Sequence, residues 1–441
     1  MPASRLLKRS LAVLALAALG PALVLASSGH PARVTVTVDR TAVVGQSRLS
    51  IGVTHTQHSL DPWGDAPAIG RGKRHLQPVV RYHNQHLYGW GAANPEPSAG
   101  RFDWHTLDRR IRVIRSLGGT PVITLCCAPD WMTELGRETS GYPNLPPTPA
   151  HVGDFAELAR QVALRYPDVR HFIVWNEFKG FYDHARRNWD YVAYTELYNQ
   201  VYRALKSVDP DISVGGPYLV VEGTGSRSLG RQGRAAANPL TARDREVLDY
   251  WLEHKAGADF IAIDRKTQSS HDENRYSPEE QLDLTRWFGS IARQLRARTS
   301  LPIWYAEDYF TDDPNWSFQA AGLASMLMAE VKSGVATSLR WGAQGSRDAP
   351  NGGNNQNLFS DTRVTGGGQP FPALAVYRAF ARHFDEGTAL VRARASSERV
   401  AVLASPSATL LINRRPERVG VRLDGGELTL EPFAVRLVRV R

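Results

Sequence analysis

The chain has 441 residues, 42% of them hydrophobic and 22% charged, so it is long enough for one large domain with a buried core and a small companion. Its formal net charge is +9, but no basic helix, basic-aromatic alternation or zinc-ligand spacing accompanies that charge, which argues against nucleic-acid binding. Three of the positive charges fall at Arg5, Lys8 and Arg9, so loss of residues 1–26 would leave +6. That mild charge permits attraction to an acidic polymer without demanding it.

The N-terminal residues have the pattern of a secretory signal. Basic residues precede an apolar run from Leu11 to Leu25, and small residues allow cleavage after Ala26. We therefore predict a signal peptide at residues 1–26 and a secreted or periplasmic protein, with no stable membrane insertion after the signal is removed. The alternative is an uncleaved membrane anchor, although the run is short for the ~20 residues that a span needs.

After the signal, Val34–Val38 alternates apolar and polar residues and predicts an edge strand. Apolar strand-like runs then alternate with amphipathic helical patterns, as in a parallel α/β fold. Eight strands with helices between them favour a closed (β/α)8 TIM barrel over an open sheet, which is the alternative. The eight runs are 49–53, 78–82, 121–126, 172–175, 212–215, 260–263, 303–306 and 338–341.

The two cysteines of the chain, Cys126 and Cys127, are neighbours at the end of the third run. Adjacent residues do not easily reach relaxed disulfide geometry, so we expect two buried thiols and no disulfide. Without a Cys or His partner nearby, the pair does not match a zinc-ligand pattern.

The helical patterns stop near Thr388, and short strands separated by turns follow. Asp424-Gly425-Gly426 is typical of a hairpin turn. We predict a catalytic barrel at residues 45–385 and a small C-terminal β-sandwich at residues 386–441, which a strand at residues 33–44 joins from the other end of the chain.

Two of the apolar runs end in a glutamate: His171–Glu177 and Leu301–Glu307. Barrel enzymes carry their chemistry at the C-terminal ends of the strands, so we expect Glu177 and Glu307 to face each other across a pocket. One protonated and one ionised carboxyl are what hydrolysis of a glycosidic bond requires. The alternative for either residue alone is a salt-bridged glutamate at the start of a loop.

Trp175-Asn176-Glu177, after the fourth strand, resembles the acid/base motif of retaining glycoside hydrolases built on the (β/α)8 barrel. The chain is most similar to glycoside hydrolase family 39, the group of β-xylosidases and α-L-iduronidases. Residues 128–132, 102–108 and 430–435 add to this resemblance, which covers the chain from about Gly45 to the C-terminus.

The resemblance implies a role for individual residues. Glu177 would be the general acid/base, and Glu307, at the end of the seventh strand, would be the nucleophile. Asn176 would hydrogen-bond the sugar hydroxyl next to the anomeric carbon. Arg81 would keep the nucleophile ionised, and Trp341 would form an apolar floor for the sugar ring. The alternatives are a structural salt bridge for Arg81 and core packing for Trp341.

The sequence departs from the family pattern near the nucleophile. The sixth strand ends in Ile263-Asp264-Arg265-Lys266, where the family has a histidine and an aromatic residue, and Glu307 is followed by Asp308-Tyr309-Phe310 in place of small polar residues. We expect Lys266 and Tyr309 to contact the substrate. Lys266 and Arg265 could bind the carboxylate or sulfate of an acidic sugar, or could lie in a solvated loop.

His55, His58 and His83 lie near the first two strands. A metal site is one interpretation, but their spacing does not match a ligand set, so we expect no metal there. We predict instead that His55 and His83 hydrogen-bond sugar hydroxyls. Trp131, in a loop, is expected to stack on the apolar face of a sugar.

Together these features predict a secreted glycoside hydrolase that cleaves a polysaccharide or oligosaccharide by a retaining double displacement, without a cofactor. The expected partner is a carbohydrate, for which an acidic glycan is one candidate. Three alternatives remain: a non-catalytic carbohydrate-binding barrel protein, a transglycosylase that uses the same site, and a metal-dependent hydrolase that uses the histidines.

Overall fold

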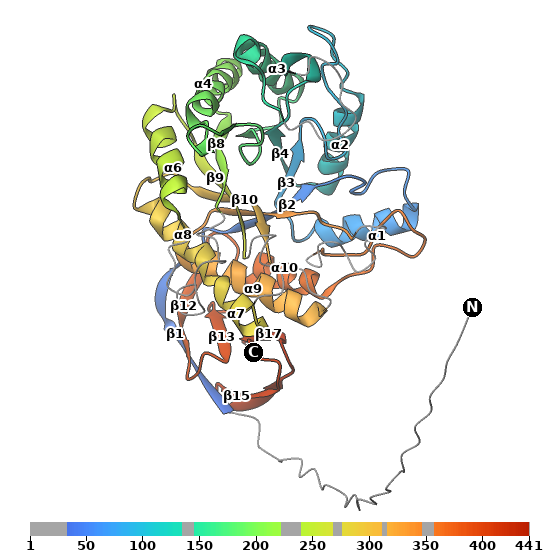
Figure 1. Cartoon of the computed structure of the whole chain (residues 1–441). Helices are drawn as coiled ribbons and strands as arrows, with labels where there is room; N and C mark the ends of the chain where they lie inside the picture. The colour runs from blue at the N-terminus through green and yellow to red at the C-terminus, as the bar shows by residue number, and fades with distance from the viewer. Residues whose placement is uncertain are drawn as a thin grey trace, which may run out of the picture.

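A closed parallel barrel forms the larger part of the protein (Figure 1). The computed structural model describes residues 33–134, 145–221, 240–267, 276–310, 315–345 and 357–440, so the predicted signal peptide lies outside the described residues. Each barrel strand is hydrogen-bonded to its two neighbours, and β11 pairs with β2 to close the ring. In order around the barrel the strands are β2 (Ser50–His55), β3 (Tyr82–His86), β4 (Thr120–Leu125), β5 (His171–Val174), β8 (Ser213–Val220), β9 (Phe260–Lys266), β10 (Ile303–Tyr309) and β11 (Thr337–Trp341).

Helices follow the barrel strands in turn and cover the outside of the barrel (Figure 1). This alternation confirms the predicted (β/α)8 architecture. The helices are α1 (Ala66–Leu76), α2 (His105–Leu117), α3 (Val152–Arg165), α4 (Tyr191–Val208), α6 (Ala242–His254), α7 (Pro278–Leu284), α8 (Arg286–Arg296), α9 (Trp316–Ser333) and α10 (Pro372–His383). The connections also contain the 3-10 turns η1 (Asp130–Met132) and η2 (Pro149–His151) and the small hairpin strands β6 (Tyr182–Asp183) and β7 (Asn188–Trp189).

Local sequence explains where these helices begin and which face they bury. The Ser277 side chain accepts a hydrogen bond from the backbone amide of Glu280, and the Glu280 side chain accepts one from the backbone amide of Ser277. A complete capping box therefore starts α7. In α2, Leu107, Ile111 and Ile114 recur at helical spacing and are at most 1% exposed. Burial of each such side chain contributes about 1.5–3 kcal/mol.

The barrel interior is filled by large side chains, so it is a packed core. Trp304 stacks on Phe260 with ring centroids 4.2 Å apart and lies 5.0 Å from the Tyr82 ring. The buried residues of this cluster are Val122, Ile173, Tyr218, Phe260, Ala262, Trp304, Ala306 and Leu339.

The C-terminal residues form a β domain that the first strand joins. In Figure 1 the blue strand β1 (Arg33–Gln46) runs beside strands from the other end of the chain. It pairs antiparallel with β12 and parallel with β15, inside a four-stranded sheet of order β12-β1-β15-β16. A second sheet has the order β13-β14-β17. The strands are β12 (Ala389–Ala395), β13 (Val400–Ala404), β14 (Ala408–Asn413), β15 (Val419–Leu423), β16 (Gly426–Leu430) and β17 (Val435–Arg439). The predicted contribution of an N-terminal strand to this domain is confirmed.

The second barrel strand differs from the prediction of 78–82. Val79 and Val80 are buried in the turn after α1, where the Val80 amide donates to the Leu76 carbonyl at 2.9 Å. The strand β3 follows at Tyr82–His86. The residues of β3 are mostly polar, so this strand does not appear as an apolar run in the sequence.

Cys126 and Cys127 form a disulfide, so the expectation of two thiols was wrong. The peptide bond between them is cis and their Cα atoms are 2.9 Å apart, shorter than the ~3.8 Å across a trans peptide. The disulfide is fully buried after the end of β4.

The position of β1 predicts unequal costs for one substitution at two places on the strand. Val36 is 3% exposed and packs in the core of the β domain, whereas Val43 is 62% exposed. Val36→Asp buries an unpaired charge and should lower the free energy of unfolding by about 3 kcal/mol or more. Val43→Asp is the matched control and should change it by about 0.5 kcal/mol or less. Urea denaturation of both variants checks this, and equal losses would contradict the central position of β1.

Candidate active site

Glu177 lies just beyond β5, in a tight turn at the mouth of the barrel. Trp175 continues the strand pairing through its amide, which donates to Leu125 at 3.1 Å. The chain then turns sharply: Trp175, Glu177 and Phe178 all have positive φ, between 53° and 68°. Such left-handed conformations are uncommon outside glycine and concentrate at functional sites. The Trp175 indole donates to the Lys179 carbonyl at 2.9 Å and fastens the turn, so the Glu177 side chain is held in place by the backbone.

Glu307 lies within β10, and an irregularity in the strand register places it opposite Asp264 of β9. Tyr305 pairs with Ile263, but the next pair along the two strands is Glu307 with Asp264, so β10 has one extra residue. Such a β-bulge re-aims side chains and is frequent beside active sites. Neighbouring strands are about 4.8 Å apart, which brings the two acidic residues side by side.

A second register irregularity brings a tyrosine to Glu307. Between β8 and β9 the pairing shifts at Pro217 and Leu219, which leaves Tyr218 as the extra residue with a φ of 54°. Its hydroxyl donates to Glu307 Oε1 at 2.6 Å, and the Tyr309 hydroxyl donates to Oε2. Both oxygens of Glu307 therefore have a hydroxyl donor, which holds the carboxyl in one orientation.

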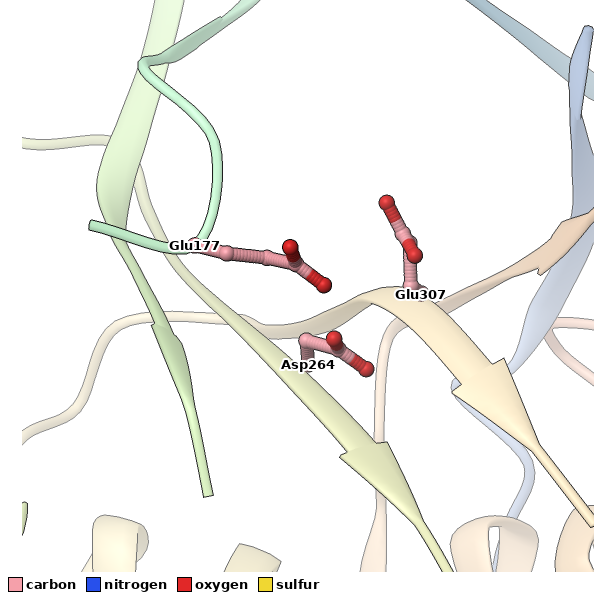
Figure 2. A group of neighbouring side chains, drawn as sticks. All are labelled: Glu177, Asp264 and Glu307. Atoms are coloured by element: carbon pink, nitrogen blue, oxygen red, sulfur yellow. The ribbon is translucent and has the colours of Figure 1, made fainter. Parts of the chain in front are cut away.

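Glu177, Asp264 and Glu307 converge on one space (Figure 2). One oxygen from each carboxyl lies within 4.8 Å of one from each of the others. Glu307 is 2% exposed and Asp264 is 4% exposed, so two of the three are buried. Like charges this close in a buried site cannot all be ionised, so the pocket must hold protons.

The surroundings distribute those protons unevenly. Burial, reinforced by the charge of Glu177, raises the pKa of Glu307 to about 8, although Tyr218 and Tyr309 hydrogen-bond to its charged form. Burial and the charges of Glu307 and Glu177 raise the pKa of Asp264 well above its usual range. Burial also pushes the pKa of Glu177 upward, but a hydrogen bond with Asp264 and the charge of Lys179 outweigh it, and the net pKa is lowered.

Lys179 connects Glu177 to the aromatic wall of the mouth. Its ammonium group forms an ion pair with Glu177 and lies 5.0 Å from the centre of the Trp90 ring. Trp90 in turn contacts Trp341 and His86, with ring centroids 5.9 and 4.3 Å apart. Indole faces of this kind are suited to the apolar C–H face of a sugar.

Polar atoms beside this wall lack partners of hydrogen-bond geometry among the described residues. They are both side-chain atoms of Asn176, both ring nitrogens of His86 and one oxygen of Asp264. Burial lowers the pKa of His86 to about 3, with the charge of Lys179 acting in the same direction, so the ring is neutral and can donate and accept. Buried polar groups are nearly always paired, so this arrangement is suited to a ligand rich in hydroxyl groups.

The three carboxyls lie close enough to surround a divalent cation. Their existing partners argue for proton chemistry instead. The Lys179 ammonium group forms an ion pair with Glu177, and the hydroxyls of Tyr218 and Tyr309 donate to the two oxygens of Glu307. We therefore assign no metal to this cluster.

Several residues predicted from the sequence lie at this mouth. Asn176 adjoins Glu177, Tyr309 donates to Glu307, and Trp341 ends β11 in the aromatic wall. Lys266 ends β9, where its charge lowers the pKa of both Glu177 and Asp264.

Arg81, His55 and His83 lie elsewhere, in contrast to the expectation. Arg81 precedes β3 at the N-terminal end of the barrel and pairs with Glu386 at 2.6 Å, because the strand begins after it. His55 Nε2 and His83 Nδ1 are 3.0 Å apart, and both rings are buried. Side chains alternate along a strand, and Tyr82 on the same strand packs inside the barrel, so His83 points outward toward the helices.

Trp131 is placed in η1, where its indole donates to the Glu96 carbonyl at 2.9 Å and its ring packs on His151. Through these two contacts Trp131 holds neighbouring loops together, which is a structural role. Its expected stacking on a sugar stays a prediction.

The sequence pattern did not indicate Tyr218, Lys179 or His86, and Asp264 stood out only as a departure from the family pattern. The signals were weak. Tyr218 follows Gly215-Gly216-Pro217, which does not look like the end of a buried strand. Lys179 stands two residues after Glu177 and could have been identified from that proximity.

The raised pKa of Glu307 predicts how stability depends on pH. The folded protein binds this proton more tightly than the unfolded chain, so the stabilisation is complete below a pH of about 4.5 and is lost as pH rises toward 8. Glu307→Gln should therefore unfold with a free energy at least about 1 kcal/mol above wild type at pH 8, and this difference should shrink at pH 5. Urea titrations at both pH values measure it. Glu253→Gln, an exposed position on α6, is the control and should show no such trend.

Comparison with known proteins shows that the barrel has a familiar fold. No protein-family model and no curated protein matches the chain. Solved structures do match in fold. A GH39 β-xylosidase from Caulobacter crescentus has 19% sequence identity and a TM-score of 0.57 over 88% of this chain and 83% of its own. The GH39 enzyme from Xanthomonas axonopodis pv. citri has 18% identity and a TM-score of 0.55 over 89% and 76%. The catalytic domain of GH30 xylanase C from Talaromyces cellulolyticus has 12% identity and a TM-score of 0.57 over 92% and 100%. The chain is thus similar in fold to glycoside hydrolases of families 39 and 30.

Proposed function

We propose that this protein hydrolyses glycosidic bonds of a polysaccharide or oligosaccharide by a retaining double displacement. The observation that carries the proposal is the convergence of Glu177 and Glu307 at the C-terminal mouth of the barrel, from β5 and β10 (Figure 2). The fold that the chain shares with glycoside hydrolases supports it. The substrate would occupy the mouth between these two carboxyls.

The spacing of the carboxyls favours retention of configuration. One oxygen of Glu177 lies within 4.8 Å of one oxygen of Glu307. Retaining glycosidases hold their two carboxyls about 5–5.5 Å apart, whereas inverting enzymes leave about 6.5–9.5 Å for a water molecule between them. Direct attack by a carboxylate is therefore the mechanism that this spacing supports.

The walls of the mouth support a carbohydrate as the ligand. Trp90 and Trp341 offer aromatic surface, and Asn176 and His86 offer donors and acceptors for hydroxyl groups. This combination of apolar faces and fixed polar groups is typical of small-molecule sites. Lys266, near Glu177 and Asp264, adds positive charge at the same end of the barrel, which would favour an acidic sugar.

In the proposed first step, the Glu307 carboxylate attacks the anomeric carbon while Glu177 gives its proton to the leaving oxygen. The product is a glycosyl ester of Glu307. In the second step Glu177 takes a proton from water, which attacks the same carbon and releases the sugar with Glu307 ionised again. The tyrosine hydroxyls of Tyr218 and Tyr309 hold the attacking carboxylate in place.

The free site favours a different proton distribution from the one that starts this reaction. There the pKa of Glu307 is about 8 and that of Glu177 is lowered, so protons reside on Glu307 and Asp264. Attack requires Glu307 to be ionised, and positive charge developing at the anomeric carbon favours that state. Glu307 must therefore give up its proton, and Glu177 must gain one, once the substrate is bound.

Removal of either glutamate tests the proposal. Glu177→Gln and Glu307→Gln should each lower kcat/KM by at least ~10³-fold on the aryl glycoside that the wild-type protein cleaves best. Far-UV circular dichroism should remain that of the wild type. Glu386→Gln, at the N-terminal end of the barrel, is the control and should keep near wild-type activity. Full turnover by either site variant would contradict the assignment.

Azide rescue distinguishes the two roles. Azide added to Glu307→Gly should give a glycosyl azide of inverted configuration, because it replaces the nucleophile. Added to Glu177→Gly, azide should instead attack the glycosyl ester and give the retained configuration. The anomeric proton signal of each product reports the outcome, and the opposite pattern would exchange the two roles.

We propose further that residues 1–26 direct secretion and are then removed. Among the residues that the structure describes, no helix combines the length and apolarity needed to cross a bilayer. N-terminal sequencing of the exported protein should begin at Ser27. A protein that retains its first residues in the membrane fraction would favour the uncleaved anchor.

A further inference from the structure

We propose that Asp264 is a positioning residue that stores the proton exchanged with Glu177 in each catalytic cycle. The inference rests on the proposed function, because it assumes that Glu177 is the general acid/base. Asp264 lies in the segment at the end of the sixth strand where this sequence departs from the pattern of glycoside hydrolase family 39, and the proposal gives this residue a role in catalysis.

The geometry of the barrel mouth is the first support. Asp264 is the residue of β9 that pairs in register with Glu307 of β10, and one of its oxygens lies within 4.8 Å of an oxygen of Glu177. Figure 2 shows its carboxyl directed toward the other two. It thus lies beside both glutamates, in reach of the proton that Glu177 must gain and lose.

The second support is an unpartnered atom. Asp264 is 4% exposed, and its Oδ1 has no partner of hydrogen-bond geometry among the described residues. A structural aspartate would pair with an arginine or with backbone amides. Arg265, the adjacent cation, is turned away: its guanidinium donates to the Val221 carbonyl at 2.6 Å and lies over the Trp287 ring.

The groups around Asp264 give it a proton in the free site. Burial raises its pKa most, and the charges of Glu307 and then Glu177 add to this effect, while Lys266 opposes it. Glu177 faces the same cluster with its partner Lys179. The charged and titratable side chains that face the carboxyl are Glu177 and Lys179 after β5, Tyr218 of β8, Lys266 of β9, and Glu307 and Tyr309 of β10.

The proton transfer balances over the cycle. Glu307 first releases its own proton to solvent, so that it can attack as a carboxylate. The Asp264 carboxylic acid gives its proton to the Glu177 carboxylate, and Glu177 then gives it to the leaving oxygen as the glycosyl ester forms. Esterification removes the charge of Glu307, which had been the largest charge acting against ionisation of Asp264. When water attacks, Glu177 takes its proton and returns it to Asp264 as Glu307 regains its charge. Glu307 then takes a proton from solvent again, so every group ends the cycle as it began and no reactant besides water is needed.

The test compares leaving groups. A 2,4-dinitrophenyl glycoside needs no acid in the first step, whereas a phenyl glycoside does. Asp264→Asn keeps the size and the donor to Glu177 but cannot supply a proton. It should lose about 100-fold in kcat/KM on the phenyl substrate and less than about 5-fold on the dinitrophenyl substrate. Asp264→Glu should recover part of the loss on the phenyl substrate.

Two outcomes would overturn the proposal. Equal losses on the two substrates would indicate a structural role, and no loss on either would indicate that Asp264 is not used. If the variants do not fold, an NMR measurement on the wild-type protein still tests whether Asp264 holds a proton. Carbon-13 NMR of protein labelled at the aspartate side-chain carboxyls should show a buried Asp that is still protonated at pH 7. Titration of every Asp with a midpoint near 4 would contradict the stored proton.

The NMR titration does not depend on turnover, so it separates this inference from the proposed function. A protonated Asp264 in a protein whose Glu177→Gln variant is fully active would leave the stored proton in place and reject the hydrolase assignment. An ordinary Asp264 titration beside a loss of activity in Glu177→Gln would do the reverse.

Discussion

Repulsion among three carboxyls in a buried space is the constraint on which the barrel mouth depends. Moving a carboxylate out of water is costly, and two more beside it make full ionisation unattainable. The surrounding residues divide this cost. Lys179 favours the charge on Glu177, hydroxyl groups orient Glu307, and burial beside two other carboxyls leaves Asp264 protonated. The distribution of protons and charge at the barrel mouth is thus set by the three carboxyls together and not by any one of them.

Backbone irregularities create that cluster from regular strands. In an ideal parallel barrel, side chains from neighbouring strands would form even layers. The shifts in pairing at Tyr218 and before Glu307 break the layers on both sides of β9. One shift turns a tyrosine toward the site and the other aligns two acids across adjacent strands. The left-handed turn after β5 supplies the third carboxyl from the opposite direction. The strained backbone is held by buried contacts such as the Trp175 indole on Lys179.

The sequence allowed the barrel, the N-terminal contribution to the β domain and the two glutamates to be predicted, because each leaves a periodic or positional signal. Glu177 and Glu307 end apolar runs, and strand order alone brings such ends together. Arg81 was expected at the wrong end of the barrel because a buried turn at Val79 and Val80 looks like a strand. Tyr218 escaped notice because a bulge inserts one residue without a compositional trace. The disulfide between the adjacent cysteines was not predicted, because the two residues are joined by a cis peptide bond and nothing in the Cys-Cys sequence indicates one.

The pairing of β1 with both β12 and β15 has a consequence for how the chain assembles. A ribosome or an export channel delivers the polypeptide from its N-terminus, so β1 emerges more than 300 residues before its partners. During that interval its backbone donors and acceptors bond to water, and they are open to pairing with other chains. Contacts of such long sequence separation form slowly. The barrel can therefore take shape first, and the β domain closes last as a clasp that joins the two ends of the described chain.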